Sequence, residues 1–561
     1  ISTITGPRRP AGDVAVIGQS GGASQVNTMW RAQEAGLGIS YQVSCGNDAD
    51  LDLLDYVAFA VESAATRVVL VIAETIADGA KLRHVAARAA DLGKPIVMIK
   101  IGRTEAGSRA AASHTGAITG ADAVFDAAAR QLGILRAGDA PELYEAAMLL
   151  RAGKHPAGRR AAAMSISGGN LVLMAEIGAT LGLEFPRYTE ATLAALRPLL
   201  PGFMGAANPT DLSAGAIGQK DLFGRVARML LGDAHVDTLV PVITFAPAAD
   251  IRATAELAAA SAKPVPILWT GKCSDDPALT PASLVAEGLA VYRDVTPCLR
   301  AVDHAARYAA FQARRLRPLP TRPSGMDAEA ARRLLDATPR GTLSEAQSKA
   351  LLACYGLPMT REDLARDAAG AVSAAASMGG PVALKVQSPD LPHKTEAGAI
   401  RLNLTGAEAI TAAHDAILAS ARRYRPDARI EGVLVQEMVT GGLEMLIGIT
   451  ADPAFGPVLA IGFGGVHVEV LRDVALRLPP IGAEEAREAL EELRLFPLLQ
   501  GVRGAPAADM DALVDAILRL SWLAQDLGDR VAEVDVNPLV VLPQGRGVRV
   551  VDALVVTGGR T

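Results

Sequence analysis

The chain has 561 residues, of which 50% are hydrophobic and 21% are charged, and its formal net charge is −6. This composition is typical of a globular protein with roughly three to five domains, and the mild negative charge disfavours nonspecific binding to nucleic acid. Four scattered cysteines without a Cys-x-x-Cys pair indicate neither a zinc site nor a disulfide framework. No apolar run reaches membrane-spanning length, and the first residues do not form a signal peptide. We therefore expect a cytoplasmic protein with no membrane partner and no nucleic-acid partner.

The first block, residues 1–152, alternates apolar strand-like runs with helical stretches. This alternation predicts a doubly wound parallel sheet. The expected strands lie at 14–18, 39–44, 68–73 and 95–100.

Two features of this block directly follow expected strands, at the edge where open α/β sheets bind their ligands. Ser20, Gly21 and Gly22 begin a helix after the first strand, and a helix N-terminus offers free N–H groups and partial positive charge to a phosphate. Glu74 follows the strand at 68–73. Its carboxylate could orient an imidazole and raise the basicity of that ring.

His114 lies in a loop of small residues with the sequence Ser-His-Thr-Gly. No cysteine, aspartate or histidine stands at metal-ligand spacing from it, which makes it a candidate nucleophile or phosphoryl carrier. A solvated loop histidine is the alternative that the loop alone favours. The Gly-rich turn and Glu74, taken together with the loop, favour the catalytic role.

These motifs, in this order, resemble the succinyl-CoA synthetase superfamily. The specific resemblance is to its nucleoside-diphosphate-forming (ADP-forming) acyl-CoA synthetases with a fused ATP-grasp domain. It extends over nearly the whole chain and rests here on Gly-Gln-Ser-Gly-Gly, the Ser-Cys-Gly-Asn at 44–47, Glu74 and Ser-His-Thr-Gly. It places the family's phosphorylated histidine at His114 and the glutamate that orients it at Glu74. The family usually carries a Rossmann-type CoA-binding domain before this point, so we expect that domain on a separate chain, or lost or missing from this sequence.

The second block, residues 153–313, repeats the design of the first. An apolar run at 160–166 leads into Ser-Gly-Gly and an apolar helix, and later strands are expected at 238–244 and 265–270. We expect a second flavodoxin-like domain whose helix N-terminus, at Gly168 and Gly169, also binds phosphate. In the family, two such helix ends face one phosphohistidine. Simple helix–sheet packing is the alternative explanation of these glycines.

Two further segments of the chain's middle have a family-like or linker-like pattern. The Asn-Pro-Thr-Asp-Leu run at 208–212 is either a turn or, by the resemblance, a segment near the active site. Residues 314–342 begin with prolines and arginines without apolar periodicity, which predicts an exposed, fairly stiff linker.

In the last block, residues 343–561, Lys385 interrupts the apolar strand expected at 381–386. It is either the solvent-facing residue of an alternating strand or a fixed point charge for a phosphate. The loop at 388–398 resembles the Ser-Pro-Asp-x-x-His-Lys-x-x-x-Gly segment of ATP-grasp domains in this branch. The resemblance implies that Lys385 and Gly398 contact nucleotide phosphates and that His393 is a second phosphoryl carrier. Without the family, His393 would be an ordinary loop residue.

The strand at 432–439 resembles the ATP-grasp segment that pairs with adenine, and Glu437 and Glu444 match the family's nucleotide-contacting acids. The Gly-rich segment at 452–465 is also family-like, with a plain hairpin as the alternative.

Oxygen side chains follow two short strand-like runs near the C-terminus, at 533–539 and 548–552. Mg²⁺ prefers hard oxygen ligands, a few from protein and the rest from phosphate and water. Asn537 and Asp552 match the family's metal ligands, with Asp535 nearby. A merely solvated acidic hairpin is the alternative.

The sequence thus predicts an α/β protein, with two flavodoxin-like doubly wound parallel-sheet domains followed by an α+β ATP-grasp domain at 343–561. The implied reaction is acid + CoA + ATP ⇌ acyl-CoA + ADP + phosphate, through a phosphohistidine and an acyl phosphate, with Mg²⁺ as cofactor. The implied partners are a small carboxylic acid, CoA, ATP and further copies of the chain in a homo-oligomer. A CoA-ligation-dependent lyase and a non-catalytic nucleotide- or acyl-CoA-binding subunit are the alternatives. No motif marks which acid is used.

Overall fold

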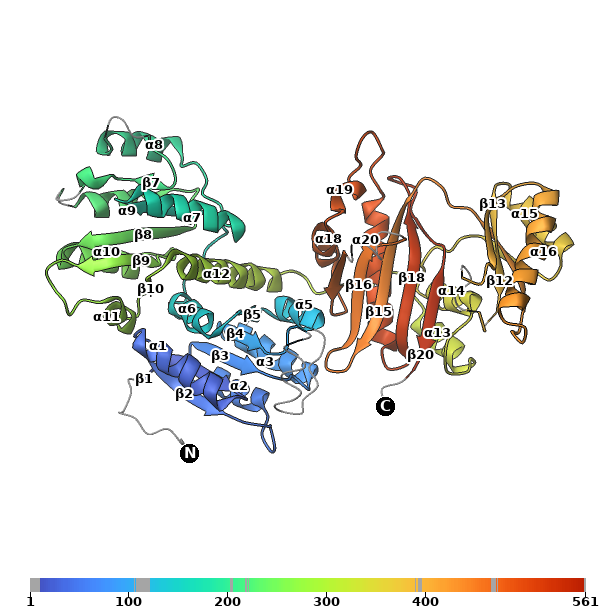
Figure 1. Cartoon of the computed structure of the whole chain (residues 1–561), viewed down its shortest axis with the longest axis horizontal. Helices are drawn as coiled ribbons and strands as arrows, with labels where there is room; N and C mark the ends of the chain where they lie inside the picture. The colour runs from blue at the N-terminus through green and yellow to red at the C-terminus, as the bar shows by residue number, and fades with distance from the viewer. Residues whose placement is uncertain are drawn as a thin grey trace. The chain divides into compact units, whose positions relative to one another are not determined.

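The computed structural model describes residues 11–104, 106, 122–201, 205–216, 219, 221–388, 390–391, 396–465, 471 and 473–558. His114 and His393 lie outside these residues. The chain forms two compact units, Ile1–Arg317 and Pro318–Thr561 (Figure 1). Among the described residues, no helix combines the length and apolar character that crossing a membrane requires.

The first domain of the first unit contains a parallel sheet of five strands in the order β2-β1-β3-β4-β5. This is the flavodoxin order. Strand β3 is a continuous apolar run with every residue buried, as expected when helices cover both faces of a sheet. The strands are β1 (Ala11–Gly18), β2 (Ile39–Ser44), β3 (Val68–Ala73), β4 (Ile96–Lys100) and β5 (Leu135–Arg136), and the helices are η1 (Gly22–Trp30), α1 (Arg31–Glu34), α2 (Leu53–Glu62), α3 (Gly79–Asp91), α5 (Asp122–Leu132) and α6 (Ala140–Leu150).

The second domain repeats this topology with the order β10-β9-β8-β6-β7, again parallel. The two predicted flavodoxin-like domains are therefore confirmed. The strands are β6 (Ala161–Ser165), β7 (Thr210–Asp211), β8 (Thr238–Ala246), β9 (Ile267–Cys273) and β10 (Val291–Tyr292), and the helices are α7 (Gly168–Thr180), α8 (Glu190–Leu196), η2 (Arg197–Leu199), η3 (Ala214–Ala216), α9 (Leu222–Gly232), α10 (Ala248–Ala260), α11 (Pro281–Ala286) and α12 (Val295–Arg315).

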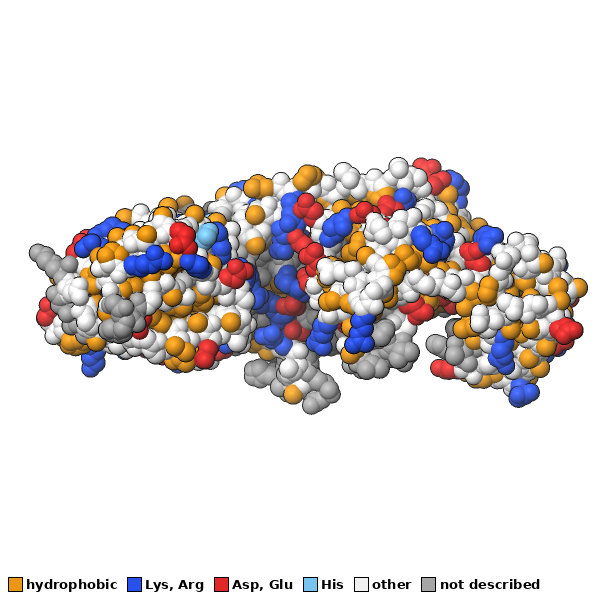
Figure 2. Space-filling model, turned by 90° about the horizontal axis from the view of Figure 1, so that it is seen from above, with side chains coloured by type: hydrophobic (Ala, Val, Ile, Leu, Met, Phe, Trp, Pro, Cys, Tyr) orange, Lys and Arg blue, Asp and Glu red, His pale blue; other side chains and the backbone are white. Residues whose placement is uncertain are grey.

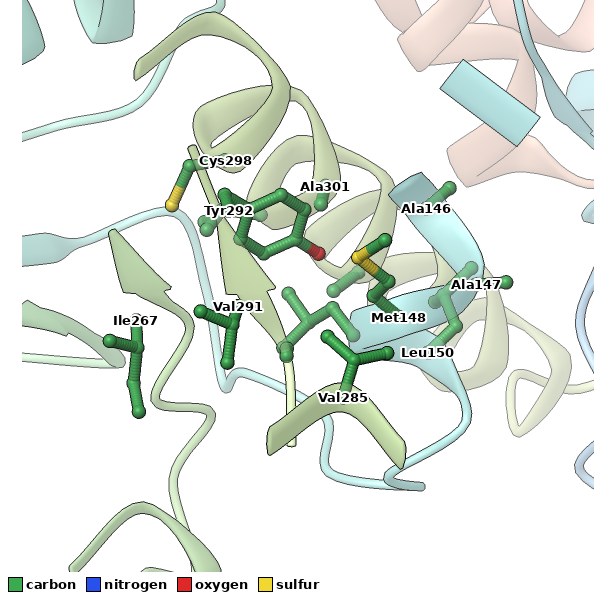
Figure 3. Packing of buried hydrophobic residues seen from close by; sticks show 14 of the residues in the cluster. Ala146, Ala147, Met148, Leu150, Ile267, Val285, Val291, Tyr292, Cys298 and Ala301 are labelled. Atoms are coloured by element: carbon green, nitrogen blue, oxygen red, sulfur yellow. The ribbon is translucent and has the colours of Figure 1, made fainter. Parts of the chain in front are cut away.

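The two flavodoxin-like domains share one hydrophobic core. Helix α12 packs against α6, and Figure 3 shows Met148 of α6 close to Tyr292 of β10 and Val285 of α11. The Tyr292 hydroxyl donates to the backbone oxygen of Glu145 over 2.9 Å. The predicted domain boundary between residues 152 and 153 thus lies between α6 and β6. The hydrophobic core is continuous across this boundary.

The second unit contains two antiparallel sheets, which confirms the predicted α+β organisation. The smaller has the order β11-β14-β12-β13 and packs against α15 and α16, and the larger has the order β17-β16-β15-β18-β19, with β20 also paired to β18 and α20 packed against it (Figure 1). The strands are β11 (Glu362–Ala365), β12 (Val382–Gln387), β13 (Ile400–Leu404), β14 (Gly432–Glu437), β15 (Leu443–Asp452), β16 (Gly456–Phe463), β17 (Val474–Arg477), β18 (Val531–Val541), β19 (Val548–Val550) and β20 (Ala553–Thr557), and the helices are α14 (Glu345–Cys354), α15 (Ala368–Met378), α16 (Ala407–Tyr424), α18 (Ala483–Glu491), α19 (Phe496–Leu499) and α20 (Met510–Leu527).

Part of the segment expected to be a linker, 314–342, is helical. Asp327 is the N-cap of helix α13 (Ala328–Asp336), and its side chain accepts the N–H of Ala330. Ala331 and Leu335, four residues apart, lie on one face of the helix and are buried in the core of the second unit. The linker prediction is therefore wrong for this stretch, because apolar residues at helical spacing bury one face of the helix in that core.

Charged side chains of both signs are interspersed on the face drawn in Figure 2. This mixture agrees with the small net charge of the sequence.

Candidate functional site

Gln19 joins the ends of two neighbouring strands in the first domain. It follows β1, it is 8% exposed, and its Oε1 accepts the backbone N–H groups of Glu74 over 2.6 Å and Thr75 over 3.1 Å. Its Nε2 donates to Asp48 Oδ2 over 2.5 Å. The predicted Glu74 therefore lies at the ligand-binding edge of the sheet, on a turn that Gln19 fixes.

Lys100 holds the same turn from the other side. It is the last residue of β4, it is 5% exposed, and its Nζ donates to the backbone oxygens of Glu74 and Ile101, each over 2.8 Å. Burial removes water from the ammonium and lowers its pKa. No motif of the sequence marks this residue, although a lysine at the end of an apolar strand, at the ligand edge of the sheet, is a signal.

Ser20, Gly21 and Gly22 lie at the same edge, since β1 pairs with β3. Both glycines are exposed at the start of the helical stretch, and the Ser24 hydroxyl donates to Ser20 O over 2.8 Å. The first nine residues of this stretch, η1, are a π-helix, a rare form that is frequent at functional sites. The structure thus brings the predicted helix start and Glu74 together.

The neighbouring thiol of Cys45 does not compete as a nucleophile. Burial, followed by the hydrogen bond and charge of Asp48, raises the pKa of Cys45 to about 12. The reactive thiolate is therefore scarce at neutral pH.

In the second domain, Gly168 and Gly169 begin α7 as predicted, but a carboxylate already faces this helix start. Asp211 Oδ2 lies 2.6 Å from the position that a Cβ on Gly168 would take, so a side chain at this position would displace the Asp211 carboxylate. Asp211 follows Asn208 in the family-like turn, and the Asn208 amide donates to Ala161 O and Pro186 O. Asn208 therefore fixes the turn, while Asp211 reaches the helix start.

Lys385 of β12 is 3% exposed, which excludes the solvent-facing alternative. Its Nζ donates to Glu345 Oε1 over 3.1 Å, to Asp552 Oδ2 over 3.4 Å and to the backbone oxygen of residue 551 over 3.4 Å. Burial alone would lower its pKa, but the charges of Asp552 and Glu345 raise it above the ordinary lysine value. The structure thus joins a predicted phosphate ligand to a predicted metal ligand and keeps the lysine charged.

A second buried lysine, Lys349 of α14, extends this network. Its Nζ donates to Glu345 Oε1 over 2.9 Å and to Glu362 Oε2 over 2.5 Å. Gln436 of β14 donates to the same Glu362 oxygen over 3.1 Å. The sequence does not reveal the buried pair Glu345–Lys349, because glutamate and lysine four residues apart are also the pattern of an exposed helix surface.

The predicted metal ligands lie on neighbouring segments. The Asn537 N–H donates to the backbone oxygen of Asp552 over 3.3 Å, and burial, with the charges of Glu533 and Asp552, raises the pKa of Asp535. Within the described residues no group of three or more His, Cys, Asp or Glu side chains has the arrangement of a metal site. Two protein oxygens still fit Mg²⁺, which takes its remaining ligands from phosphate and water.

Asn537 and Glu444 each lie close to one of the two glycines, Gly464 and Gly465, that follow β16. A Cβ on Gly464 would lie 3.1 Å from Asn537 Oδ1, and one on Gly465, where φ is +62°, would lie 2.5 Å from Glu444 Oε2. Glycine at both positions therefore leaves the space beside these oxygens open.

Glu437 and Gly398, also predicted to contact the nucleotide, form hydrogen bonds with arginines. Glu437 accepts the Arg361 backbone N–H over 2.9 Å and the Arg361 Nε over 2.7 Å. Burial alone would raise the pKa of Glu437, but these hydrogen bonds from Arg361 lower it below its ordinary value. Gly398 has a φ of +60°, and its oxygen accepts from Arg401 over 3.1 Å.

Comparisons with known proteins agree with this architecture. Residues 11–150 match the succinyl-CoA ligase-like flavodoxin domain, and residues 334–557 match the ATP-grasp domain. The ADP-forming acetate–CoA ligase I of Archaeoglobus fulgidus is 33% identical over 96% of this chain and 77% of its own length. The ADP-forming 4-hydroxybutyrate–CoA ligase of Nitrosopumilus maritimus is 30% identical over 97% of this chain and 78% of its own. A solved structure, the dinucleotide-forming acetyl-coenzyme A synthetase 1 of Ca. Korarchaeum cryptofilum with phosphate and ADP, has 28% identity and a TM-score of 0.48 over 56% of this chain and 68% of that one.

Fold and relatives together define a ligase with an ATP-grasp domain. The chain belongs to the ADP-forming acyl-CoA synthetases of the succinyl-CoA synthetase superfamily, which confirms the resemblance inferred from its motifs.

Proposed function

We propose that this chain joins a carboxylic acid to CoA in a reversible reaction that cleaves ATP to ADP and phosphate. The observation that carries the proposal is the buried, charged Lys385 beside Asp552 in the ATP-grasp unit. A buried ammonium with an adjacent carboxylate is a preformed site for a nucleotide phosphate and its metal ion.

At the nucleotide site, Lys385 donates to the phosphate oxygens of ATP, with Gly398, Glu437 and Glu444 as further nucleotide contacts. Asn537 and Asp552 would hold Mg²⁺, and bound Mg²⁺ supplies positive charge against the transferring phosphoryl group. Support for these roles comes from the donor set, because carboxylate and amide oxygens are hard ligands that this ion prefers.

His114 is the carrier in this proposal. An imidazole nitrogen attacks the terminal phosphorus of ATP, the N–P bond forms, and the P–O bond to ADP breaks. Glu74 accepts the remaining ring N–H and stabilises the charged ring. Supporting this role, Gln19 and Lys100 hold the Glu74 backbone from two sides.

The phosphoryl group then moves to the acid. A carboxylate oxygen attacks phosphohistidine, releasing the imidazole and forming an acyl phosphate, and the CoA thiolate attacks the acyl carbon and expels phosphate. The helix starts at Ser20, Gly21 and Gly22 and at Gly168 and Gly169 stabilise the phosphoryl oxygens through their N–H groups. We further propose His393 as a second carrier between ATP and His114. In that case His393 attacks the terminal phosphorus and releases ADP, and His114 then attacks the phosphorylated His393, forming its own N–P bond as the first one breaks.

The test is incubation of the protein with Mg·ATP, CoA and a panel of carboxylic acids, followed by mass spectrometry. We expect acyl-CoA and ADP in equal amounts with at least one acid. The two relatives are named for acetate and 4-hydroxybutyrate, so the panel includes both.

Other products would contradict the proposal. AMP in place of ADP would exclude the phosphohistidine route, an elimination product would indicate the lyase, and nucleotide binding without turnover of any acid would indicate the binding subunit.

A further inference from the structure

A pocket of about 430 Å³ lies at one edge of the second parallel sheet. Ile166, directly after β6, and residues 242–246 of β8 contribute to its lining. β6 and β8 are the strands at which the order of this sheet reverses. Ligands of open α/β sheets bind at the carboxyl ends of strands at that point, and the volume is within the range of about 300–1,000 Å³ for small-molecule sites.

The lining of the pocket is suited to a hydrocarbon. Large apolar side chains dominate it, namely Ile166, Phe223, Val242, Ile243, Phe245 and Pro247. The described lining residues include no lysine and no arginine, but they include Asp221 and Asp250. Asp221 already pairs with Arg228 over 3.1 Å. Carboxylates without a free cation repel phosphate, so this pocket does not suit ATP or the phosphorylated end of CoA.

One hydroxyl of the lining has no partner of its own. The Thr244 Oγ1 atom is buried and makes no hydrogen bond with any described residue. In contrast, the Thr254 hydroxyl donates to Asp250 O over 2.9 Å, and the Gln219 amide donates to Gly215 O over 2.8 Å. Because this oxygen is buried, it does not open onto the pocket, and the unpaired hydroxyl does not offer a polar contact to a ligand there.

The pocket adjoins the predicted phosphate-binding helix start along the chain. Ile166 of the lining stands two residues before Gly168, the first residue of α7. A ligand with its hydrocarbon body in the pocket therefore lies close to this helix start along the chain, where the Asp211 carboxylate already stands near Gly168.

We propose that this pocket binds the hydrocarbon part of the carboxylic acid that the enzyme activates, a body larger than the methyl group of acetate. The proposal rests on the acid–CoA ligation proposed above. It names the second flavodoxin-like domain as the part of the chain that selects the acid.

The test compares two substitutions on α10. Ala253 is exposed and lines the pocket, whereas Ala259 is exposed on the same helix and does not. Binding of hexanoate and phenylacetate to the full chain is measured by ligand-observed NMR, without ATP or CoA. We expect Ala253→Phe to weaken binding of both acids about tenfold or more, because it fills the pocket. Ala259→Phe should bind them like the unmodified protein, and circular dichroism verifies that both variants fold.

Equal affinity of Ala253→Phe and Ala259→Phe would overturn the proposal, as would absence of binding to the unmodified protein. The proposed function fails separately. If Ala253→Phe loses acid binding but the unmodified protein forms no acyl-CoA, the pocket stands and the ligase reaction does not. If acyl-CoA forms and KM for the acid is unchanged in Ala253→Phe, the reaction stands and the pocket does not.

Discussion

Lys100 in the first unit and Lys385 in the second are both lysines on strands, and both are almost fully buried. Their surroundings differ. Lys100 donates to two backbone carbonyl oxygens, and burial lowers its pKa. Lys385 donates to two carboxylates, whose charges raise its pKa against the effect of burial.

The difference separates two uses of the same side chain. Carbonyl dipoles fix an ammonium in place without cancelling its charge, so Lys100 is suited to holding the Glu74 turn. Carboxylates stabilise the charged form, so Lys385 remains a cation that a phosphate can bind. Lys100 is therefore suited to positioning the Glu74 turn, whereas Lys385 is suited to the nucleotide contact proposed for it.

The largest effect is expected from Lys385→Met, which removes the phosphate ligand. We expect kcat/KM for ATP to fall about 10²–10³-fold, the usual loss for a preorganised donor in a closed site. ATP-dependent ADP release measures it. Arg366→Met, at an exposed cation of the same unit, is the control. If kcat/KM for ATP falls less than threefold in Lys385→Met, Lys385 does not belong to the nucleotide site.

The second-largest effect is expected from Glu345→Ala, which should lower the stability of the second unit. Glu345 Oε1 accepts from both Lys349 and Lys385, so its removal leaves two buried ammonium groups without this partner. Breaking a buried ion pair costs about 3 kcal/mol or more, which lowers the Tm of this unit by roughly 6–12 °C. Differential scanning calorimetry measures the shift. Glu408→Ala, an exposed glutamate in the first turn of α16, should change the Tm little, and an equal shift in both variants would refute the bridging role.

Lys100→Met should have a smaller effect on catalysis. Losing a charged hydrogen bond to Glu74 O should slow phosphorylation of the protein by ATP about tenfold, equivalent to about 1.4 kcal/mol, while KM for ATP stays constant. Lys94 is a matched control, because its Nζ also donates to two backbone oxygens, those of Val61 and Ser63, from the opposite end of β4. Similar slowing by Lys94→Met would mean that the effect is general loss of packing.

The smallest expected effect concerns the pH dependence of stability. The contributions of Lys100 and Lys385 to the free energy of unfolding should change with pH in opposite directions. The lowered pKa of Lys100 means that the unfolded chain binds this proton more tightly. Its contribution to the free energy of unfolding therefore rises with pH between the lowered pKa and about pH 10.4. The raised pKa of Lys385 gives a contribution that is complete below about pH 10.4 and is lost as pH rises through the raised value.

Urea unfolding of the unmodified protein and of the two methionine variants, from about pH 7 to pH 11, measures these contributions as differences. The difference for Lys100 should become more favourable with rising pH, and that for Lys385 less favourable near the upper end. The same sign for both lysines would contradict the assignment of carbonyl partners to one and carboxylate partners to the other.

The strands were predictable because buried parallel strands are continuous apolar runs. Val68–Ala73 was placed correctly, whereas the strand expected at 14–18 begins at Ala11. Polar strand ends are not marked by apolar pattern, so these boundaries shift by a few residues.

Side-chain partners were less predictable than strand positions. Lys385 and Asp552 were named from their motifs, but their contact joins segments far apart in sequence. Asp211 reaches Gly168 only because β7 pairs with β6. Such contacts depend on tertiary packing, which spacing along the chain does not encode.

The central claim is that a histidine carries the phosphoryl group, and the most direct measurement locates that group. The protein is incubated briefly with [γ-³²P]ATP and Mg²⁺, kept at alkaline pH, digested and analysed by tandem mass spectrometry. We expect an acid-labile, base-stable phosphate on the peptide that contains His114. The account is contradicted if acyl-CoA and ADP form while His114 is never phosphorylated, or if His114→Ala forms acyl-CoA at the full rate.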